Sequence, residues 1–394
     1  MRIAMFSWES LHSIFLGGLG VHVTELAAGL ERRGHEVHVI TRRKQNQNGY
    51  DLIDGVHYHR VDHEIVEGNF VATMDKMCQA MANKFADITN MVGHFDLIHA
   101  HDWLCGNAMK YSMQRFGTKG ILTMHSTEYG RDGNVFYDGY AREIRDCEAE
   151  ACFHADQIIC VSGFLAEEVE RIYAVPHSKI HVVPNGVNYH AFDGLIDPAA
   201  VKAQYGIAPM APTIFAAGRM SLQKGMDMLV EAVPMVLASY PEAKFIISGS
   251  GPEKEHVVRV AQEIGATGSI VFLDSLPRPQ YIDLMRAVDI VAVPSRNEPF
   301  GIVVLEAWAA GKPVVCTTAG GPREFVWHNV NGFLVDANPG GLAHGIGSLL
   351  ADHEHCRALG ANGRKACEDM FNWDNVCAYT EGVYQYVLDN NFAC

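Results

Sequence analysis

Short apolar runs alternate with longer helical patterns along this chain, and this alternation constrains the fold more than any other feature. Residues 2–6 form a strand-like run, residues 21–33 carry the apolar period of a helix, and residues 36–40 return to a strand. Such a strand–helix–strand unit makes parallel strands, because the helix is the crossover between them. Further strands of this first series are predicted at residues 97–100, 120–124, 157–162 and 180–183.

A second series of the same kind occupies the other half of the chain. Its strands are predicted at residues 213–217, 244–248, 269–273, 289–294, 313–317 and 332–335. With 394 residues the chain exceeds the roughly 250–300 at which one hydrophobic core stops growing, so two domains are expected. The predicted fold is α/β, with two doubly wound Rossmann-like domains whose ligands bind at the carboxyl ends of the strands. The predicted parts are an N-terminal domain (residues 1–190), a linker (191–212), a C-terminal domain (213–372) and a C-terminal helix (373–394) that crosses back to the first domain.

Charge and cysteine content narrow the partners and the compartment. The formal charge of −15 disfavours broad attraction to nucleic acid, while a local basic pocket can still bind phosphate. The ten cysteines contain no Cys-x-x-Cys pair, which favours reduced cysteines in a cytoplasmic protein. No apolar run approaches the 18 residues of a membrane span, and no signal peptide is evident. The basic turn at residues 42–44 has two possible roles. It can contact an anionic membrane, or it can simply be a solvated turn, which is the simpler explanation. The sequence leaves the oligomeric state open.

Two short segments carry the residues expected to bind phosphate. Gly17-Gly18-Leu19-Gly20 lies between the first strand and the first helix, where backbone N–H groups can face an anion. A turn that only closes the strand–helix corner explains the same glycines. Arg219 and Lys224 follow the first strand of the second domain and combine a bidentate guanidinium with a point charge. Solvated surface cations are the alternative there.

Glu298 and Glu306 are the most informative pair of carboxylates. Pro299 and Gly301 open a helix between them, so Glu298 is expected in the preceding loop and Glu306 about two turns into the helix, facing the same cleft. Carboxylates in these places can bind sugar hydroxyls or a ribose diol. The alternative is that Glu298 interacts favourably with the helix dipole and that Glu306 is solvated. The apolar residues between them argue against solvation of Glu306, because they predict a buried helix.

Histidines end two predicted strands of the first domain. His99 and His101 share a face, with Asp102 next to them, and His125 follows the neighbouring strand. Two histidines on one face suggest a metal, but no third ligand is evident, and a structural role is the commoner explanation. No Asp-x-Asp sequence occurs, so no metal site and no cofactor are predicted, and leaving-group charge must be met by cations and N–H groups.

Taken together, these motifs resemble the retaining glycosyltransferases of family 4, which have the two-domain GT-B fold. The resemblance runs along nearly the whole chain and includes Pro184-Asn185-Gly186-Val187, Gly249–Pro252 and Gly320-Gly321 as well. It implies a nucleotide-diphosphate sugar bound in a cleft between the domains, and front-face attack in which the leaving phosphate takes the acceptor proton. The implied catalytic residues are Glu298, His125, Arg219 and Lys224, and the implied donor-binding residues are Gly18, Arg219, Lys224, Gly301, Val303, Val304, Leu305 and Glu306.

Within the family, the His125–Arg131 segment resembles glycogen- or α-glucan-synthase-like members. This resemblance implies transfer of a hexose, glucose, to a glycan or other hydroxyl acceptor. Residues implied near the acceptor are His101, Asp102, Tyr129 and Arg131. The nucleotide base stays open, because the lysine that bacterial ADP-glucose synthases carry before the glycine pair is missing, and Glu306 supplies a carboxylate that they lack.

Other functions remain as alternatives. The acceptor can be a lipid or a small molecule instead of a glycan. Among non-transferases, a nucleotide-sugar epimerase, a phosphorylase or a non-catalytic nucleotide-sugar sensor can use the same scaffold. The complete set of Arg219, Lys224, Glu298 and Glu306 favours the transferase. An NAD-dependent dehydrogenase is disfavoured, because the dinucleotide fingerprint is missing.

Overall fold

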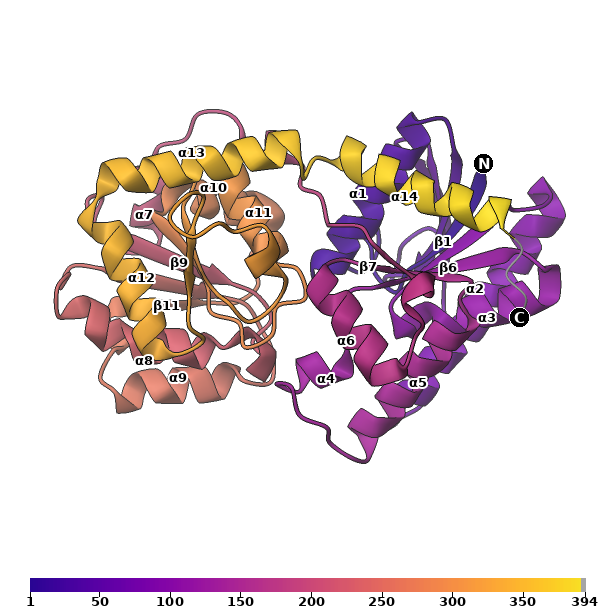
Figure 1. The fold of residues 1–394 in the computed structure, drawn as a ribbon, viewed down its shortest axis with the longest axis horizontal. Helices are drawn as coiled ribbons and strands as arrows, with labels where there is room; N and C mark the ends of the chain where they lie inside the picture. Colours follow the sequence, from indigo (N-terminus) through magenta and orange to yellow (C-terminus); the bar gives the residue numbers. More distant parts are fainter. Residues whose placement is uncertain (391–394) are drawn as a thin grey trace. The chain divides into compact units, whose positions relative to one another are not determined.

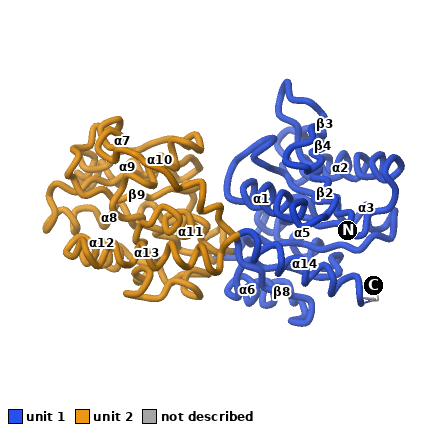
Figure 2. The backbone as a smooth tube through the Cα atoms, turned by 90° about the horizontal axis from the view of Figure 1, so that it is seen from above, with its two compact units in different colours: residues 1–129, 135–185, 373–394 blue, residues 130–134, 186–372 orange. Residues whose placement is uncertain are grey.

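The computed structural model describes residues 1–390, which form two compact units. Unit 1 contains residues 1–129 and 135–185 together with the C-terminal helix from residue 373, and unit 2 contains residues 130–134 and 186–372 (Figure 2). The sequence predicts residues 191–212 as a linker, whereas the structure assigns them to unit 2. The reason is local: Asp197 caps a short helix there, and Lys202 on that helix is buried and bound to Asp289 Oδ2 at 2.8 Å.

An eight-stranded sheet forms the centre of unit 1, with the strand order β3-β4-β2-β1-β5-β6-β7-β8. All neighbouring strands are parallel except β3 and β4, which form a hairpin. The central strand β1 is almost fully buried, as expected of a parallel sheet covered on both faces. The strands are β1 (Arg2–Phe6), β2 (Glu36–Arg42), β3 (Tyr50–Ile53), β4 (Val56–Val61), β5 (Leu97–His101), β6 (Lys119–Met124), β7 (Gln157–Cys160) and β8 (Ile180–Val182).

Helices cover both faces of this sheet, and the C-terminal helix α14 packs beside α1 on one of them (Figure 1). Leu26 and Leu30 of α1 share a hydrophobic core with Val376 and Tyr384 of α14. The helices of unit 1 are α1 (Gly18–Arg32), α2 (Phe70–Val92), α3 (Gly106–Phe116), α4 (Glu128–Arg131, which runs into unit 2), α5 (Tyr140–His154), α6 (Gly163–Tyr173) and α14 (Trp373–Asp389), with 3₁₀ turns η1 (Trp103–Cys105) and η2 (His177–Lys179).

Unit 2 contains a six-stranded, fully parallel sheet in the order β11-β10-β9-β12-β13-β14. Its core is apolar and includes Phe245, Ile290 and Leu349. The strands are β9 (Thr213–Ala217), β10 (Lys244–Ser248), β11 (Ile270–Leu273), β12 (Ile290–Val293), β13 (Val314–Thr317) and β14 (Phe333–Val335). The remaining elements are the helices α7 (Pro198–Gln204), α8 (Met226–Leu237), α9 (Lys254–Glu263), α10 (Arg278–Ala287), α11 (Ile302–Ala309), α12 (Pro339–Ala351) and α13 (His353–Asp369), and the 3₁₀ turns η3 (Tyr189–Phe192), η4 (Leu222–Lys224), η5 (Thr267–Ser269) and η6 (Gly321–Glu324).

The described cysteines are packing residues. All nine are unpaired thiols, and eight of them are buried. Burial raises the pKa of the Cys78 thiol to about 12, so it is a poor nucleophile and a poor metal ligand. Cys394 lies outside the described residues. Among residues 1–390, no helix has the length and apolar character needed to span a membrane.

Candidate active site

Glycines bring the loops at the carboxyl edge of the unit 2 sheet into direct backbone contact. Gly218, after β9, donates its N–H to Ser248 O at 3.1 Å, and Met220 N–H donates to Ser250 O at 2.8 Å. A Cβ on Gly249 would lie 1.9 Å from Gly218 O, and Gly249 has φ +149°. Only glycine fits this position, because any side chain would collide with the neighbouring backbone. The two loops therefore form one continuous edge.

Lys224 and Glu298 form the central ion pair of this edge. Lys224 Nζ lies 3.0 Å from Glu298 Oε1 and 2.8 Å from Oε2, and Ser295 Oγ donates to Oε2 at 2.8 Å. The backbone of Glu298 is held as well, since its N–H donates to Ala319 O and its carbonyl accepts from Gly321 N–H, both at 2.8 Å. Glu298 is 7% exposed. These partners fix the buried carboxylate in place.

Arg219 differs from Lys224 in its surroundings. It is exposed, and no hydrogen bond or ion pair to any described residue engages its guanidinium. The predicted pair of cations therefore divides into one ammonium held beside a carboxylate and one guanidinium that is available to an anion.

Gly301 caps the start of α11 (Ile302–Ala309) with φ +103°, so the first turn of the helix follows a sharp bend after Glu298. Val304 and Leu305 are buried, and Val303 is half-buried. Glu306 is the fifth residue of the helix, one turn in, where the sequence predicts about two turns. Its carboxylate binds the Arg278 guanidinium and accepts from Tyr281 Oη at 2.5 Å.

This arrangement refines the expectation that Glu298 and Glu306 face one ligand. Each carboxylate has its own protein partners: Lys224 and Ser295 for Glu298, Arg278 and Tyr281 for Glu306. Burial and the Glu306 charge raise the pKa of Tyr281 far above its usual value, so its hydroxyl stays protonated and donates.

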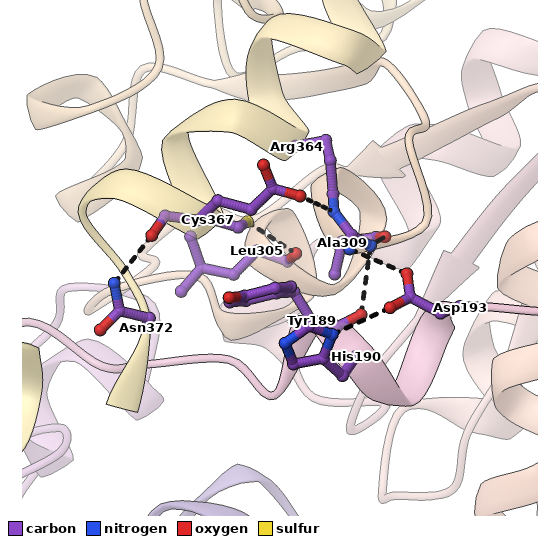
Figure 3. Close-up of polar contacts among 9 residues, drawn as sticks. Tyr189, His190, Asp193, Leu305, Ala309, Arg364, Cys367 and Asn372 are labelled. Atoms are coloured by element: carbon purple, nitrogen blue, oxygen red, sulfur yellow. Dashed lines mark hydrogen bonds and ion pairs between the residues drawn. The ribbon is translucent and has the colours of Figure 1, made fainter. Parts of the chain in front are cut away.

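The far end of α11 is fixed by Arg364 of α13 (Figure 3). Arg364 Nη1 donates to Ala309 O at 2.6 Å and to Tyr189 O at 3.1 Å, and Nη2 binds Asp193 Oδ1 at 2.8 Å. Cys367 Sγ donates to Leu305 O at 3.4 Å. The helix that begins at the candidate site is thus tied to α13 and η3, which limits its movement.

In unit 1, the glycine-rich segment is organised around a buried carboxylate, Glu9. Helix α1 begins at Gly18, so Gly18 and Gly20 lie in its first turn, and Gly17 precedes it as the N-cap. Glu9 Oε2 accepts from Leu16 N–H at 2.6 Å and Gly17 N–H at 3.1 Å, and Oε1 accepts from Gly20 N–H at 3.2 Å. These three donors serve Glu9 instead of a ligand, and the N–H of Gly18 is not among them. Burial raises the pKa of Glu9.

The histidines divide into a structural residue and a cluster. His99 is fully buried, with Nδ1 2.7 Å from Tyr384 Oη and Nε2 2.6 Å from Thr123 Oγ1. His101 Nδ1 lies 3.2 Å from His125 Nε2, and His22 of α1 lies beside both rings. The sequence shows no third ligand beside His99 and His101, whereas the structure groups His101 with His22 and His125. Burial lowers the pKa of His125 to about 3, so its ring is neutral.

The predicted acceptor residues come from both units of the structure. Asp102 has φ +59°, and its Oδ1 accepts from His125 N–H at 2.8 Å, which places it next to the His101–His125 pair. Tyr129 instead packs against Phe136, with 4.6 Å between ring centroids, and under Arg171. Arg131 belongs to unit 2. The acceptor assignment stays a prediction.

Several residues of the site are not predicted from the sequence. Arg278, Tyr281 and Ser295 complete the carboxylate pairs, and Glu9 shapes the glycine segment. Only Glu9 leaves a signal, as a lone acid between an apolar strand and a glycine run.

Comparison with known families agrees with this architecture. Residues 16–190 match the family described as Glycosyltransferase Family 4, and residues 199–366 match the family described as Glycosyl transferases group 1. Together the two matches span most of both units.

Individual relatives cover nearly the whole chain. An uncharacterized glycosyltransferase of Methanocaldococcus jannaschii is 34% identical, with 99% of each chain covered. A D-inositol 3-phosphate glycosyltransferase of Xylanimonas cellulosilytica is 32% identical (93% of this chain, 91% of the relative), and a glycogen synthase of Mycobacterium tuberculosis is 27% identical (98% and 94%). Among solved structures, a sucrose-phosphate synthase from Thermosynechococcus elongatus has a TM-score of 0.83 at 24% identity, with 98% and 99% of the two chains covered. Two parallel α/β units, the carboxylate–cation edge and these similarities along the full length show that the chain is a glycosyltransferase with the GT-B fold and belongs to family 4.

Proposed function

We propose that this protein is a retaining glycosyltransferase that moves a hexose, glucose, from a nucleotide-diphosphate sugar to a hydroxyl acceptor. The observation that carries the proposal is the Lys224–Glu298 ion pair at the carboxyl edge of unit 2, with the unengaged Arg219 on the loop that also leads to Lys224. Cations at this edge stabilise the charge that develops on a leaving diphosphate, and a fixed carboxylate accepts hydrogen bonds from sugar hydroxyls. Nucleotide-sugar donors are the substrates that the family resemblance implies.

In this proposal, leaving-group charge is met by Arg219, Lys224 and backbone N–H groups at the start of α11. Catalysis of transfer then needs no metal ion and no cofactor. Retention follows from attack on the face from which the diphosphate leaves, and the departing phosphate oxygen takes the acceptor proton. Gly18 and His125 belong to unit 1, and their contacts with the donor remain predictions.

The first experiment measures nucleotide release from UDP-, GDP- and ADP-sugars, with and without a maltooligosaccharide. Release from one donor that depends on the acceptor supports transfer to a glucan. The anomeric configuration of the product, measured by NMR coupling constants, tests retention. If none of these nucleotide sugars binds, the proposal is wrong.

A small phosphorylated polyol is the second candidate acceptor. The observation in its favour is the 32% identity to a D-inositol 3-phosphate glycosyltransferase, which exceeds the 27% identity to a glycogen synthase. The release assay therefore includes inositol 3-phosphate beside the maltooligosaccharide. Release stimulated only by the inositol phosphate would place the protein with the small-molecule transferases and against glucan synthesis.

A double variant, Arg219→Ala with Lys224→Ala, tests the assigned chemistry, because it removes both cations from the leaving group. We expect the double variant to lose turnover. Circular dichroism, measured without a donor, checks that the variant is still folded. The matched control combines Lys244→Ala, at the opposite end of β10, with Arg259→Ala on the exposed face of α9. An equal loss in the control would contradict a specific role. A sensor would keep a regulatory output without turnover, and an epimerase would convert the sugar without releasing nucleotide.

A further inference from the structure

Three histidines of unit 1 come together from three separate elements. His22 lies on α1, His101 ends β5, and His125 follows β6. One ring nitrogen of each lies within 4.8 Å of those of the other two. The centroid of the His22 ring is 5.3 Å from that of His101 and 4.7 Å from that of His125. Because each ring is fixed by a helix or a strand end, the group is held by the scaffold instead of by a flexible loop.

The tautomer of His22 follows from its neighbour. Its Nδ1 lies 2.7 Å from Asn185 Oδ1, and an amide oxygen can only accept a hydrogen bond, so Nδ1 carries the proton. The lone pair is therefore on Nε2. This atom is buried, and no hydrogen-bond partner for it exists among the described residues. A hydrogen bond from the second ring nitrogen to a fixed oxygen acceptor is the outer-shell contact that metal-binding histidines usually have, and Asn185 Oδ1 supplies such an acceptor here.

His101 has the same kind of unpaired atom. Its Nδ1 is 3.2 Å from His125 Nε2, close enough for one proton to be shared between the two rings. Its Nε2 is buried and has no partner among the described residues, and the whole residue has 0% exposure. A buried polar atom without a partner destabilises the folded state, so two of them in one cluster indicate that a ligand satisfies them.

The chemistry of the three donors selects the ligand. They are neutral nitrogen atoms, which suit Zn²⁺ and disfavour Mg²⁺ and Ca²⁺, both of which prefer oxygen. Zinc sites with three protein ligands keep a fourth position open, and Zn–N bonds of about 2.0–2.1 Å place ligand nitrogens roughly 3.4 Å apart in a tetrahedron. One nitrogen of each ring already lies within 4.8 Å of those of the other two, so each separation shortens by at most about 1.4 Å when the three bind one ion.

We propose that His22, His101 and His125 form a Zn²⁺ site, with Asn185 as the outer-shell partner of His22. Asp102 stabilises the arrangement because its Oδ1 accepts from His125 N–H at 2.8 Å. None of these residues is among the cations proposed to meet the leaving diphosphate, so the proposed transfer does not require zinc. If His125 also contacts the donor sugar, which rests on the proposed function, bound zinc inhibits turnover and chelation restores it.

Zinc binding is measured first, because it does not depend on any activity. Protein stripped with a chelator is dialysed against buffered free Zn²⁺ in the micromolar range, and bound metal is counted by elemental analysis. We expect one equivalent for the wild-type protein and loss of that equivalent in His22→Asn and in His125→Ala. Asn185→Ala should bind zinc about 10–100-fold more weakly, as expected for an outer-shell change.

The matched control is His57→Asn, in a second histidine group of unit 1. His57 stacks on His38, with 4.4 Å between ring centroids, and the three-histidine cluster does not include it. This variant should keep the full equivalent. Unchanged zinc binding in the His22 and His125 variants, or loss in the His57 variant alone, would overturn the assignment.

Two measurements on the wild-type protein keep the proposal falsifiable if a histidine variant fails to fold. Co²⁺ in place of zinc should give the intense visible absorption of a four-coordinate site, and X-ray absorption at the zinc edge should count three imidazole nitrogens. A six-coordinate spectrum, or one imidazole per zinc, would show surface binding and refute the site. Zinc binding without inhibition would refute the donor-sugar role of His125 while leaving the metal site intact.

Discussion

Replacing Glu9 with glutamine should loosen the start of α1, and the size of the effect can be worked out from its three hydrogen bonds. Oε2 accepts from Leu16 N–H and Gly17 N–H, and Oε1 accepts from Gly20 N–H. Glutamine has almost the same volume but only one acceptor oxygen. In either orientation, its NH₂ group faces at least one backbone donor, so at least one buried N–H loses its partner.

An unsatisfied buried donor costs about 1–3 kcal/mol. Part of this cost is offset because glutamine carries no charge to desolvate, and desolvation is the main reason why the pKa of Glu9 is raised. A net destabilisation of about 1–2 kcal/mol is therefore expected, which corresponds to a roughly 5–30-fold faster amide exchange from the open state.

Hydrogen exchange followed by mass spectrometry reads this change directly in peptides that cover residues 9–22. The control is Glu67→Gln, an exposed glutamate of the same unit. A pH series adds a second readout. The pKa of Glu9 in the folded state lies above its usual value of 4.5, so the folded state binds the proton more tightly than the unfolded state does. The contribution of Glu9 to the free energy of unfolding therefore falls as the pH rises from 4.5 through the raised pKa. The variant should lack this dependence. Equal exchange in Glu9→Gln and wild-type protein would refute the idea that the carboxylate holds the glycine segment.

Three further substitutions test other parts of the structure. Arg219→Ala should leave urea unfolding unchanged, because no described residue engages its side chain, but should lower turnover about 10²–10³-fold; normal turnover would contradict its role. Glu381→Gln removes the partner of Arg33 and should cost about 0.5 kcal/mol in urea unfolding at pH 7, since the pair is partly screened by solvent. Because Arg33 lowers the pKa of Glu381, this cost should vanish as pH falls below 4.5, and a constant cost would argue against the ion pair. Tyr384→Phe leaves His99 Nδ1 without a partner and should destabilise unit 1 by about 1–3 kcal/mol; no change would show that water replaces the hydroxyl.

The parallel strands were predictable because each is a short apolar run that must be buried on both faces. The predicted strands at residues 2–6, 213–217 and 244–248 are confirmed residue for residue. The hairpin of β3 and β4 was missed, since polar residues and the Asp54-Gly55 turn interrupt its apolar pattern. Strand β3 lies at the edge of the sheet, where one-sided burial leaves a weaker signal.

The position of the Lys224–Glu298 pair could also be predicted from the sequence. Both residues lie in loops that follow strands, and in the structure these strands, β9 and β12, are neighbours. The carboxyl ends of neighbouring parallel strands meet at one edge, so residues 74 positions apart can pair.

The side chains that pair with the other buried acids could not be predicted from the sequence. An apolar pattern shows that Glu306 is buried, and burial requires a partner, but nothing local indicates that Arg278 and Tyr281 of α10 supply it. The histidine cluster is similar, because α1, β5 and β6 meet only in the folded sheet. Strand order, which the sequence does not state, decides which polar side chains become neighbours.

The Lys224–Glu298 ion pair at the candidate site links recognition of the donor's diphosphate to recognition of its sugar in the proposed reaction. Glu298 is 7% exposed and depends on Lys224, so a diphosphate that draws Lys224 away would leave a buried carboxylate without its cation. Hydroxyl groups of the donor sugar can replace that partner, whereas a free nucleoside diphosphate brings none. The intact donor should therefore bind more tightly than the diphosphate product. Glu298→Gln removes the charge that needs compensation, and it should narrow this difference in calorimetric titrations of both ligands; an unchanged difference would mean that Lys224 binds the diphosphate without leaving Glu298.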